Sequence, residues 1–144
     1  MKEKVLISAC LLGVDCKYSG GNNCLDDEKL GRLKEKYDLI PVCPEAYGGL
    51  TTPRAPSERL GDKVVSKYGT DVTEQFRKGA EAALFLAKLF DVKLAILKEN
   101  SPSCGSGTIY DGTFTGTLVS GDGMTAELLK KHGIAVIDEN DALI

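Results

Sequence analysis

The amino-acid sequence predicts an α/β fold, a three-layer sandwich with helices on both faces of a mainly parallel, Rossmann-like sheet. Short β-rich runs alternate with longer amphipathic segments, which is the order typical of parallel sheets. The run Val92–Leu97 is almost wholly apolar, as expected for a strand buried on both faces. Stretches rich in Gly, Pro, Asn and Ser follow the runs, so we expect long functional loops at the carboxyl ends of the strands.

The first third of the chain contains two expected strands and one expected helix. Lys4–Ala9 is a short β-rich run, and the polar, glycine-containing stretch Val14–Asn23 predicts a loop. Asp26–Tyr37 has acidic residues early and lysines late, the distribution that the helix dipole favours. Leu39–Cys43 is a second strand, and its Pro41 predicts an edge position or a bulge.

The middle of the chain is expected to contain a long loop and the longest helix. Pro44–Arg59 is rich in proline and glycine, which predicts an extended loop with little regular structure. Lys63–Tyr68 reads as a short strand or half of a hairpin. Asp71–Phe90 has its apolar residues on one helical face, and Asp71 with Glu74 resembles a capping box.

The last third completes the sheet. We expect Val92–Leu97 to be a central strand and Gly105–Gly123 to be loop and turn, with Asp111-Gly112 forming a tight turn. Thr125–His132 predicts a short helix that the following glycine ends. Ile134–Ile137 is the last expected strand.

The length and composition of the chain limit the classes of protein to which it can belong. A chain of 144 residues suffices for one hydrophobic core, and we expect residues 1–144 to form a single domain. The net charge of −3 without a basic cluster argues against duplex nucleic acid as a partner, because neutralising phosphates requires grouped Lys and Arg. Single nucleotides and free bases are not excluded as ligands. No apolar run approaches roughly 18 residues and no signal-peptide pattern is seen, so we expect a cytoplasmic protein outside the membrane.

The cysteines are the most informative residues. Their number is odd, and they are Cys10, Cys16, Cys24, Cys43 and Cys104. In a reducing compartment a disulfide framework is not expected, so metal or redox chemistry is the better explanation for cysteines that cluster. The alternative interpretation is that each cysteine is a small buried apolar residue.

Three of the cysteines are expected at one edge of the sheet. Cys10 ends the first strand, Cys43 ends the second, and Cys104 follows the apolar third strand. Ligand sites of open parallel sheets lie at the carboxyl ends of the strands, and Cys16 lies in a loop on the same side. Three thiolates suit zinc or an iron–sulfur cluster. The chain lacks a CxxC pair, and its single histidine, His132, ends a distant helix, which disfavours zinc without excluding it.

Several polar residues accompany these thiols. Glu45 follows Cys43 closely and is a candidate general acid or base, or else a solvated loop acid. Ser101 and Ser103 flank a proline beside Cys104 and are candidates for binding substrate or orienting water, or else form an ordinary turn. Arg54 and Arg59 are candidate contacts for an anionic or carbonyl-bearing ligand, or else structural ion pairs.

Three cysteine-bearing motifs extend over nearly the whole chain. They are Ser8-Ala9-Cys10-Leu11-Leu12-Gly13 with Cys16-Lys17-Tyr18, then Cys43-Pro44-Glu45 with Gly48-Gly49-Leu50, then Lys98-Glu99-Asn100-Ser101-Pro102-Ser103-Cys104-Gly105 with Ile109-Tyr110-Asp111-Gly112-Thr113-Phe114. Together they resemble the thiouracil desulfidase family of small cytosolic iron–sulfur proteins. The resemblance implies a 4Fe–4S cluster with one iron open to substrate, at which water replaces the sulfur of a thiolated pyrimidine without net redox change.

The resemblance also implies roles for individual residues. The cluster ligands would be Cys10, Cys43 and Cys104, while Glu45 and Ser101 would handle the proton and the attacking water. Cys16 also occupies a motif position, so it is a ligand, a neighbour of the cluster or a persulfide carrier, and Cys24 is expected to be structural. The small-molecule substrate would be a thiolated nucleobase, although other thiolated compounds and thiolated transfer-RNA bases stay open.

The chemistry is reasonable for such a site. A thiocarbonyl sulfur is soft and is expected to bind iron, which leaves the ring carbon open to a water deprotonated by Glu45. Leu11, Leu12 and Tyr47 are expected to form the apolar wall of the ring pocket. Two alternatives use the same cysteines, namely a zinc enzyme or zinc-stabilised domain, and a non-enzymatic sulfur carrier.

Overall fold

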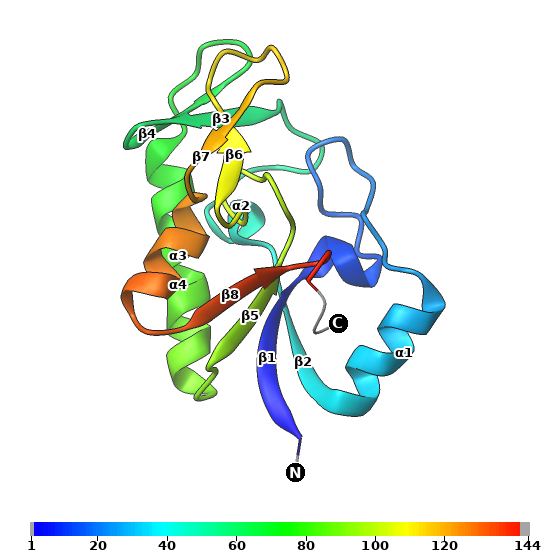
Figure 1. Cartoon of the computed structure of the whole chain (residues 1–144). Helices are drawn as coiled ribbons and strands as arrows, with labels where there is room; N and C mark the ends of the chain where they lie inside the picture. The colour runs from blue at the N-terminus through cyan, green and yellow to red at the C-terminus, as the bar shows by residue number, and fades with distance from the viewer. Residues whose placement is uncertain (1, 142–144) are drawn as a thin grey trace.

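The computed structural model describes residues 2–141, and a four-stranded parallel sheet lies at its centre (Figure 1). The strands run in the order β2-β1-β5-β8. Their bounds are β1 Glu3–Ser8, β2 Tyr37–Val42, β5 Leu94–Leu97 and β8 Ala135–Asp138. Each neighbouring pair is parallel. The predicted fold class is therefore confirmed, and the edge position that Pro41 predicted for β2 is confirmed as well.

Helices cover both faces of the sheet. The bounds are α1 Asp27–Lys36, α3 Thr73–Leu89 and α4 Met124–Lys131. Side chains alternate along β1, so that Val5 and Ile7 pack with Leu33 of α1, whereas Leu6 packs on the opposite face with Leu84 and Leu129 of α3 and α4. This alternation follows from the two-residue period of a strand. It produces the three layers visible in Figure 1.

The start of α1 agrees with the sequence prediction, whereas the start of α3 differs from it. The Asp26 side chain caps α1 and accepts the Lys29 backbone N–H at 2.8 Å. The capping box expected at α3 does not form. The Asp71 carboxylate accepts the Thr73 N–H at 2.9 Å, and Glu74 pairs with Arg77 instead. Asp71 therefore shapes the turn before α3 rather than the first turn of the helix.

The prediction of an extended loop over Pro44–Arg59 is wrong at both of its ends. Pro44–Tyr47 forms a short helix, α2, with the proline in its first turn, where its fixed φ and missing N–H are tolerated. Ser57–Leu60 forms β3, which pairs antiparallel with β4, Lys63–Ser66. The tight turn between β3 and β4 contains Gly61 with φ of 61°. The hairpin interpretation of Lys63–Tyr68 is thus confirmed.

The stretch Gly105–Gly123 also holds more structure than expected. It contains a second hairpin, made of β6, Thr108–Tyr110, and β7, Leu118–Ser120. The expected tight turn at Asp111-Gly112 is the beginning of a longer connection, residues 111–117, which the hydrogen bond from Asp111 N to Thr117 O closes at 3.0 Å. Both hairpins lie beyond the carboxyl ends of the sheet strands, at the top of Figure 1.

Two close backbone approaches fix the elements that follow β2 and β5. A Cβ on Gly79 of α3 would lie 1.8 Å from the Pro44 carbonyl oxygen, so α2 packs on α3 without an intervening side chain. A Cβ on Gly123 would lie 2.4 Å from the Ser103 carbonyl carbon, so the loop after β5 packs directly on the start of α4. Within residues 2–141 no helix has the length and apolar character to cross a membrane.

Candidate functional site

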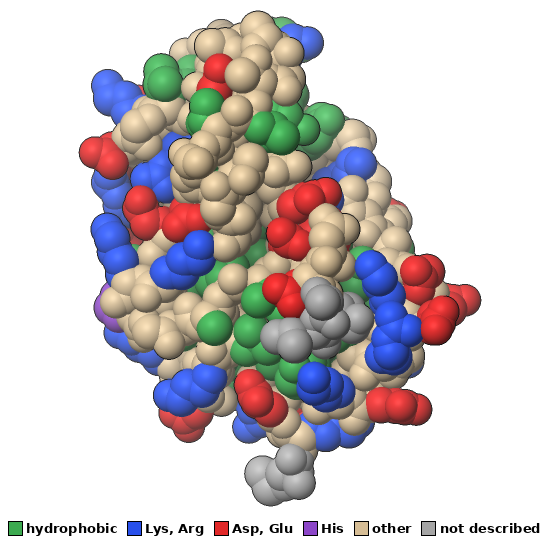
Figure 2. All heavy atoms as spheres, in the orientation of Figure 1, with side chains coloured by type: hydrophobic (Ala, Val, Ile, Leu, Met, Phe, Trp, Pro, Cys, Tyr) green, Lys and Arg blue, Asp and Glu red, His purple; other side chains and the backbone are tan. Residues whose placement is uncertain are grey.

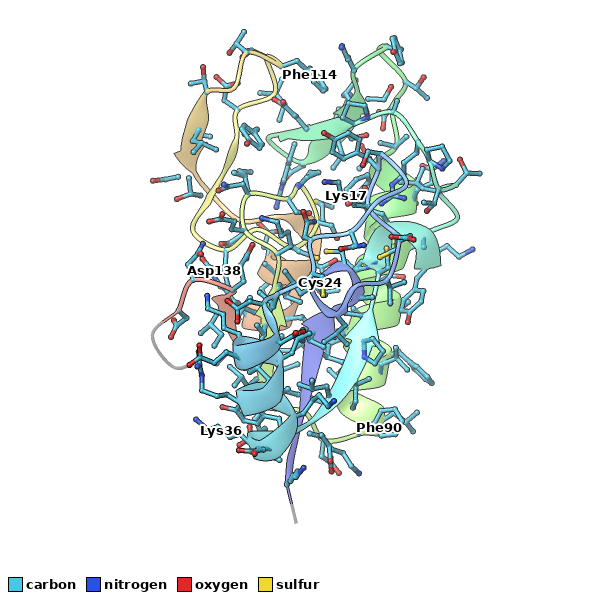
Figure 3. All side chains as sticks on the ribbon, turned by 90° about the vertical axis from the view of Figure 1, so that its right-hand side faces the viewer. Lys17, Cys24, Lys36, Phe90, Phe114 and Asp138 are labelled. Atoms are coloured by element: carbon cyan, nitrogen blue, oxygen red, sulfur yellow. The ribbon has the colours of Figure 1, made fainter. Side chains whose placement is uncertain are left out.

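A cavity of about 600 Å³ lies between the carboxyl ends of the strands and the two hairpins. Residues from separate parts of the chain line it, and the candidates among them are Cys10, Cys16, Cys43, Cys104, Glu45 and Ser101. All five cysteines of the chain are free thiols. In Figure 3 the yellow sulfur atoms gather in the middle of the molecule, below the loops that carry Lys17 and Phe114.

Cys10 lies in a tight 3-10 turn, Ala9–Leu12, that directly follows β1. The turn ends at Gly13, whose φ of 98° is readily adopted by glycine. The Asn23 side-chain amide donates a hydrogen bond to Cys10 Sγ at 3.4 Å. Burial raises the pKa of the Cys10 thiol, and this hydrogen bond opposes the increase because it favours the thiolate.

Cys43 directly follows β2 and precedes α2. Its thiol donates a hydrogen bond to the Cys16 carbonyl oxygen over 3.7 Å. Burial, followed by the neighbouring Cys43, raises the pKa of the Cys16 thiol to about 12. Arg54 Nη2 also donates to the Cys16 carbonyl at 2.9 Å, so the loop with Cys16 is tied to the segment after α2.

Cys104 is the most deeply placed of the thiols that line the cavity. Cys104 is 6 % exposed. Burial raises the pKa of its thiol to about 12, and a hydrogen bond with the Ser8 hydroxyl opposes this increase. Ser101 Oγ accepts the Cys104 backbone N–H at 3.0 Å and the Ser103 N–H at 3.1 Å. The serine therefore shapes the turn that presents Cys104.

Glu45 and Arg54 form a largely buried ion pair at the wall of the cavity. Arg54 Nε lies 3.1 Å from Glu45 Oε1, and the two side chains are 7 % and 19 % exposed. Burial raises the pKa of Glu45, while the guanidinium of Arg54 opposes this shift. Arg54 also donates to the Thr51 carbonyl and the Thr52 hydroxyl. Its donors are thus engaged by the protein, which matches the ion-pair interpretation of this arginine rather than an anion contact.

Two other candidates from the sequence lie outside the cavity. Ser103 is fully buried, and its hydroxyl is hydrogen-bonded to the Thr125 hydroxyl at 2.8 Å, behind the turn that carries Cys104. Arg59 of β3 is buried, pairs with Glu127 of α4 at 3.1 Å and donates to the carbonyl of Asp122, which precedes α4, at 2.7 Å. The structure therefore supports the structural interpretation of both residues.

The expected apolar wall differs from the observed one. Leu11 is fully buried in the core, Leu12 packs against the same core cluster, and Tyr47 donates its hydroxyl to the Pro41 carbonyl at the surface. The aromatic residues that line the cavity include Tyr110 and Phe114 of the second hairpin. Tyr110 and Phe114 both belong to the third cysteine-bearing motif described above. The glycine- and threonine-rich sequence around them did not indicate that this stretch would fold over the cavity.

Sequence reasoning also missed two charged residues at the cavity, Lys98 and Glu58. Lys98, which follows β5, lines the cavity and pairs with Glu139 at 2.7 Å beyond the end of the neighbouring strand β8. Glu58 of β3 lines the cavity as well. The partners of these residues are distant in sequence, so no local pattern indicated the contacts.

The chemistry of the donor groups bears on which metal centre the cavity could hold. Within residues 2–141 no three side chains of His, Cys, Asp or Glu are grouped so that they would hold a single metal ion. Among the described residues, the cavity is lined by four free cysteines and by no histidine. Soft thiolate ligands suit an iron–sulfur cluster, so the residues present fit such a cluster.

The fold and the cavity together define an α/β protein with a thiol-lined pocket at the carboxyl edge of its parallel sheet. Sequence comparison gives the family: the 2-thiouracil desulfurase model matches residues 5–141, and the chain belongs to this family. The resemblance inferred from the three motifs is thereby confirmed.

Two relatives illustrate the match. The chain is 44% identical over 147 residues to the uncharacterized protein YbbK of Bacillus subtilis (strain 168), an alignment that covers 95% of this chain and 96% of the relative. It is 46% identical to the [4Fe-4S]-dependent thiouracil desulfidase TudS, whose solved structure superposes with a TM-score of 0.94 over 99% of this chain and 94% of TudS.

Proposed function

We propose that this chain is an iron–sulfur desulfidase that converts the thiocarbonyl of a thiolated pyrimidine into a carbonyl. The observation that carries the proposal is the convergence of Cys10, Cys43 and Cys104 with Glu45 on one cavity. Membership of the 2-thiouracil desulfurase family and the close similarity to TudS support it. The reaction consumes one water and releases one hydrogen sulfide, so it needs neither an oxidant nor a reductant.

Cys10, Cys43 and Cys104 would hold a 4Fe–4S cluster. They project from the ends of β1 and β2 and from the loop after β5, so the rigid sheet sets their relative positions. When bound, the cluster supplies a Lewis-acidic iron that accepts the soft thiocarbonyl sulfur. Each thiol must lose its proton to become a ligand, and these protons are released when the cluster binds.

Glu45 is the proposed general base. Its carboxylate lies at the cavity wall, where it can accept a proton from the water that adds to the ring carbon. Arg54 holds this carboxylate in place and favours its ionised form against the effect of burial. Glu45 would then give this proton to the departing sulfide. It would next take the proton of the new hydroxyl as the carbonyl forms and pass it on as well, so that both protons of the water leave with the sulfur as hydrogen sulfide.

Ser101 is the proposed hydrogen-bond donor to the substrate. Its oxygen accepts two backbone N–H groups, so both of its lone pairs are engaged. Within residues 2–141 no protein acceptor binds its hydroxyl hydrogen. Because Ser101 lines the cavity, that hydrogen is available to stabilise negative charge that develops on the ring during water addition.

The remaining cysteines and Ser103 receive lesser roles in this proposal. Ser103 supports the turn before Cys104 through its contact with Thr125. Cys16 lies beside Cys43 and is either an additional sulfur ligand or a neighbour of the cluster. A persulfide on Cys16 would need a two-electron oxidant, which this hydrolysis does not supply. Cys24 is exposed and donates to the carbonyl of Leu25, and we assign it no part in the chemistry.

A small molecule is the proposed substrate, and the cytoplasm is the proposed location. Free thiols on every cysteine are in keeping with a reducing compartment. Lys and Arg side chains are interspersed with Asp and Glu on the face shown in Figure 2, and the net charge is −3. Such a surface is poorly suited to duplex nucleic acid.

Anaerobic purification tests this proposal directly. The protein should be brown, contain iron and acid-labile sulfide, and release sulfide from thiouracil. Cys43→Ala should lose the visible absorption, whereas the matched variant Cys24→Ala should keep it. Stoichiometric zinc without iron would establish the zinc alternative. Sulfide release by cluster-free protein that depends on Cys16 would establish the sulfur-carrier alternative.

A further inference from the structure

Asn23, at the end of the loop that follows the Cys10 turn, holds Cys10 by two hydrogen bonds. Its backbone N–H donates to the Cys10 carbonyl oxygen at 2.9 Å, and its side-chain Nδ2 donates to Cys10 Sγ at 3.4 Å. Asn23 also lines the cavity. In Figure 3 the chain descends from Lys17 to Cys24, which lies at the level of the sulfur atoms. One residue, 13 positions further along the chain, therefore fixes both the backbone and the sulfur of Cys10.

The loop around Asn23 is closed by the neighbouring asparagine. The Asn22 amide donates to the Asp15 carboxylate at 2.9 Å, and its oxygen accepts the Cys24 backbone N–H at 3.0 Å. The start and the end of the loop are thus joined directly beside Asn23. Because the backbone is fixed on both sides, the Asn23 amide is aimed at the Cys10 sulfur in the cluster-free protein already.

The hydrogen bond from Asn23 suits a thiolate better than a thiol. A thiolate has no proton and can only accept hydrogen bonds, and the carboxamide of asparagine supplies the N–H donor. A hydrogen bond to a charged acceptor is roughly twice as strong as one between neutral groups. When Cys10 loses its proton and becomes a ligand, this contact is therefore kept and strengthened.

The three proposed cluster ligands differ in their hydrogen bonds. Cys10 receives the Asn23 amide, and Cys104 is hydrogen-bonded by the Ser8 hydroxyl. The Cys43 thiol instead donates to a carbonyl oxygen, and this bond is lost when the thiol gives up its proton. Hydrogen bonds to the sulfur atoms of an iron–sulfur cluster help to set its reduction potential, because they draw electron density away from the sulfur.

We propose that Asn23 is a positioning residue whose side-chain N–H, donated to the Cys10 sulfur, makes the bound cluster more electron-poor and so a better acceptor for the thiocarbonyl sulfur. This inference rests on the proposed desulfidase function. Asn23 acts through Cys10, because its amide hydrogen-bonds the ligand and takes no part in the bonds that form or break. The same hydrogen bond keeps the Cys10 sulfur in the direction required for ligation.

The reduction potential of the cluster tests this role without reference to turnover. Photoreduction with deazaflavin, followed by electron paramagnetic resonance, measures it in anaerobically reconstituted protein. Asn23→Leu removes the donor at similar size and should shift the potential to more negative values. Asn23→Asp has the same shape but adds a negative charge, so its shift should be larger. Asn23→Gln keeps an amide N–H and should lie between Asn23→Leu and wild-type protein.

Asn22→Asp is the matched control. It introduces the same new charge one residue away, at an exposed position, and should leave the potential nearly unchanged. The potential reports only clusters that are bound, so incomplete loading of a variant does not obscure the comparison. Circular dichroism of the cluster-free variants checks that each one folds.

Two further measurements connect the hydrogen bond with ligation and with turnover. Iron retained in competition with a chelator should fall on the order of tenfold in Asn23→Leu, the usual effect of removing a hydrogen-bond partner of a metal ligand. The kcat for thiouracil, expressed per bound cluster, should fall in the same order of variants as the potential.

The outcomes separate this inference from the proposed function. Wild-type protein that holds no cluster, or holds one and releases no sulfide from thiouracil, would overturn the proposed function. Active wild-type protein whose potential is unchanged by Asn23→Leu and Asn23→Asp would overturn the assignment of Asn23. A shifted potential with unchanged kcat per cluster would overturn the contribution of Asn23 to the reaction.

Discussion

Arg54 donates a hydrogen bond from Nε to Glu45 Oε1 at 3.1 Å, and both side chains are largely buried beside the thiols. A carboxylate in such a place would favour its neutral form without a cation, because burial penalises the charge. The guanidinium also holds the Cys16 carbonyl and the turn at Thr51. One residue thus links the proposed base to the loop beside Cys43.

Arg54→Gln should move the acidic limb of the pH–activity profile to higher pH. Burial already raises the pKa of Glu45, and Arg54 lowers it, so removing the positive charge raises this pKa further. A general base works when ionised, hence activity is lost as the pH falls through the pKa of Glu45, and in the variant this loss comes at higher pH. The profile of kcat/KM measures it. Arg32→Gln, which removes the exposed pair with Glu28, is the control. An acidic limb that stays in place in Arg54→Gln would contradict the role of the ion pair.

Two glycine-to-alanine changes in helices should have opposite effects on stability. In Gly79→Ala the new Cβ would meet the Pro44 carbonyl oxygen at 1.8 Å, so α2 must shift away from α3. We expect a loss of about 1–3 kcal/mol in the free energy of unfolding, together with reduced iron content, because α2 adjoins Cys43 and Glu45. Gly31 in α1 has open space around its Cβ position, and Gly31→Ala should stabilise by up to about 1 kcal/mol. Urea unfolding of the cluster-free proteins measures both, and equal stability of the two variants would refute the packing argument.

The convergence of Cys10 and Cys43 was predictable because a general rule connects strand ends with sites. Each cysteine immediately follows a recognisable β-rich run, and parallel strands present their carboxyl ends at one edge. The helix Pro44–Tyr47 was not predictable in the same way. It is too short to be indicated by periodicity, and its place depends on a backbone contact with Gly79, far along the chain.

The direction in which a loop side chain points could not be predicted from the sequence either. Ser101 and Ser103 looked equivalent around Pro102, yet one lines the cavity and the other contacts Thr125, 22 residues later. The contact between Glu58 and the N–H of Phe114 spans 56 residues. Local sequence patterns report local geometry, so pairings over such separations require the folded structure.

Ser103→Ala should destabilise the protein without abolishing turnover by the folded fraction. The change leaves the Thr125 hydroxyl buried without its partner, which costs about 1–3 kcal/mol. The double variant with Thr125→Val removes both hydroxyls and should recover part of that loss. Thermal unfolding and the activity per iron measure the two effects. A stable Ser103→Ala protein that binds iron but releases no sulfide would instead assign Ser103 to the chemistry.

Insertion of the cluster into the cluster-free protein should be strongly favoured by rising pH. Burial raises the pKa of Cys104 to about 12 and also raises that of Cys10, so these thiols carry their protons at neutral pH and must release them on ligation. Raising the pH from about 7 to about 9 removes part of this cost and should increase the iron bound in competition with a chelator. Calorimetry in buffers of different ionisation enthalpy should record protons released during reconstitution. Binding that is independent of pH and releases no protons would contradict ligation of the cluster by Cys10 and Cys104.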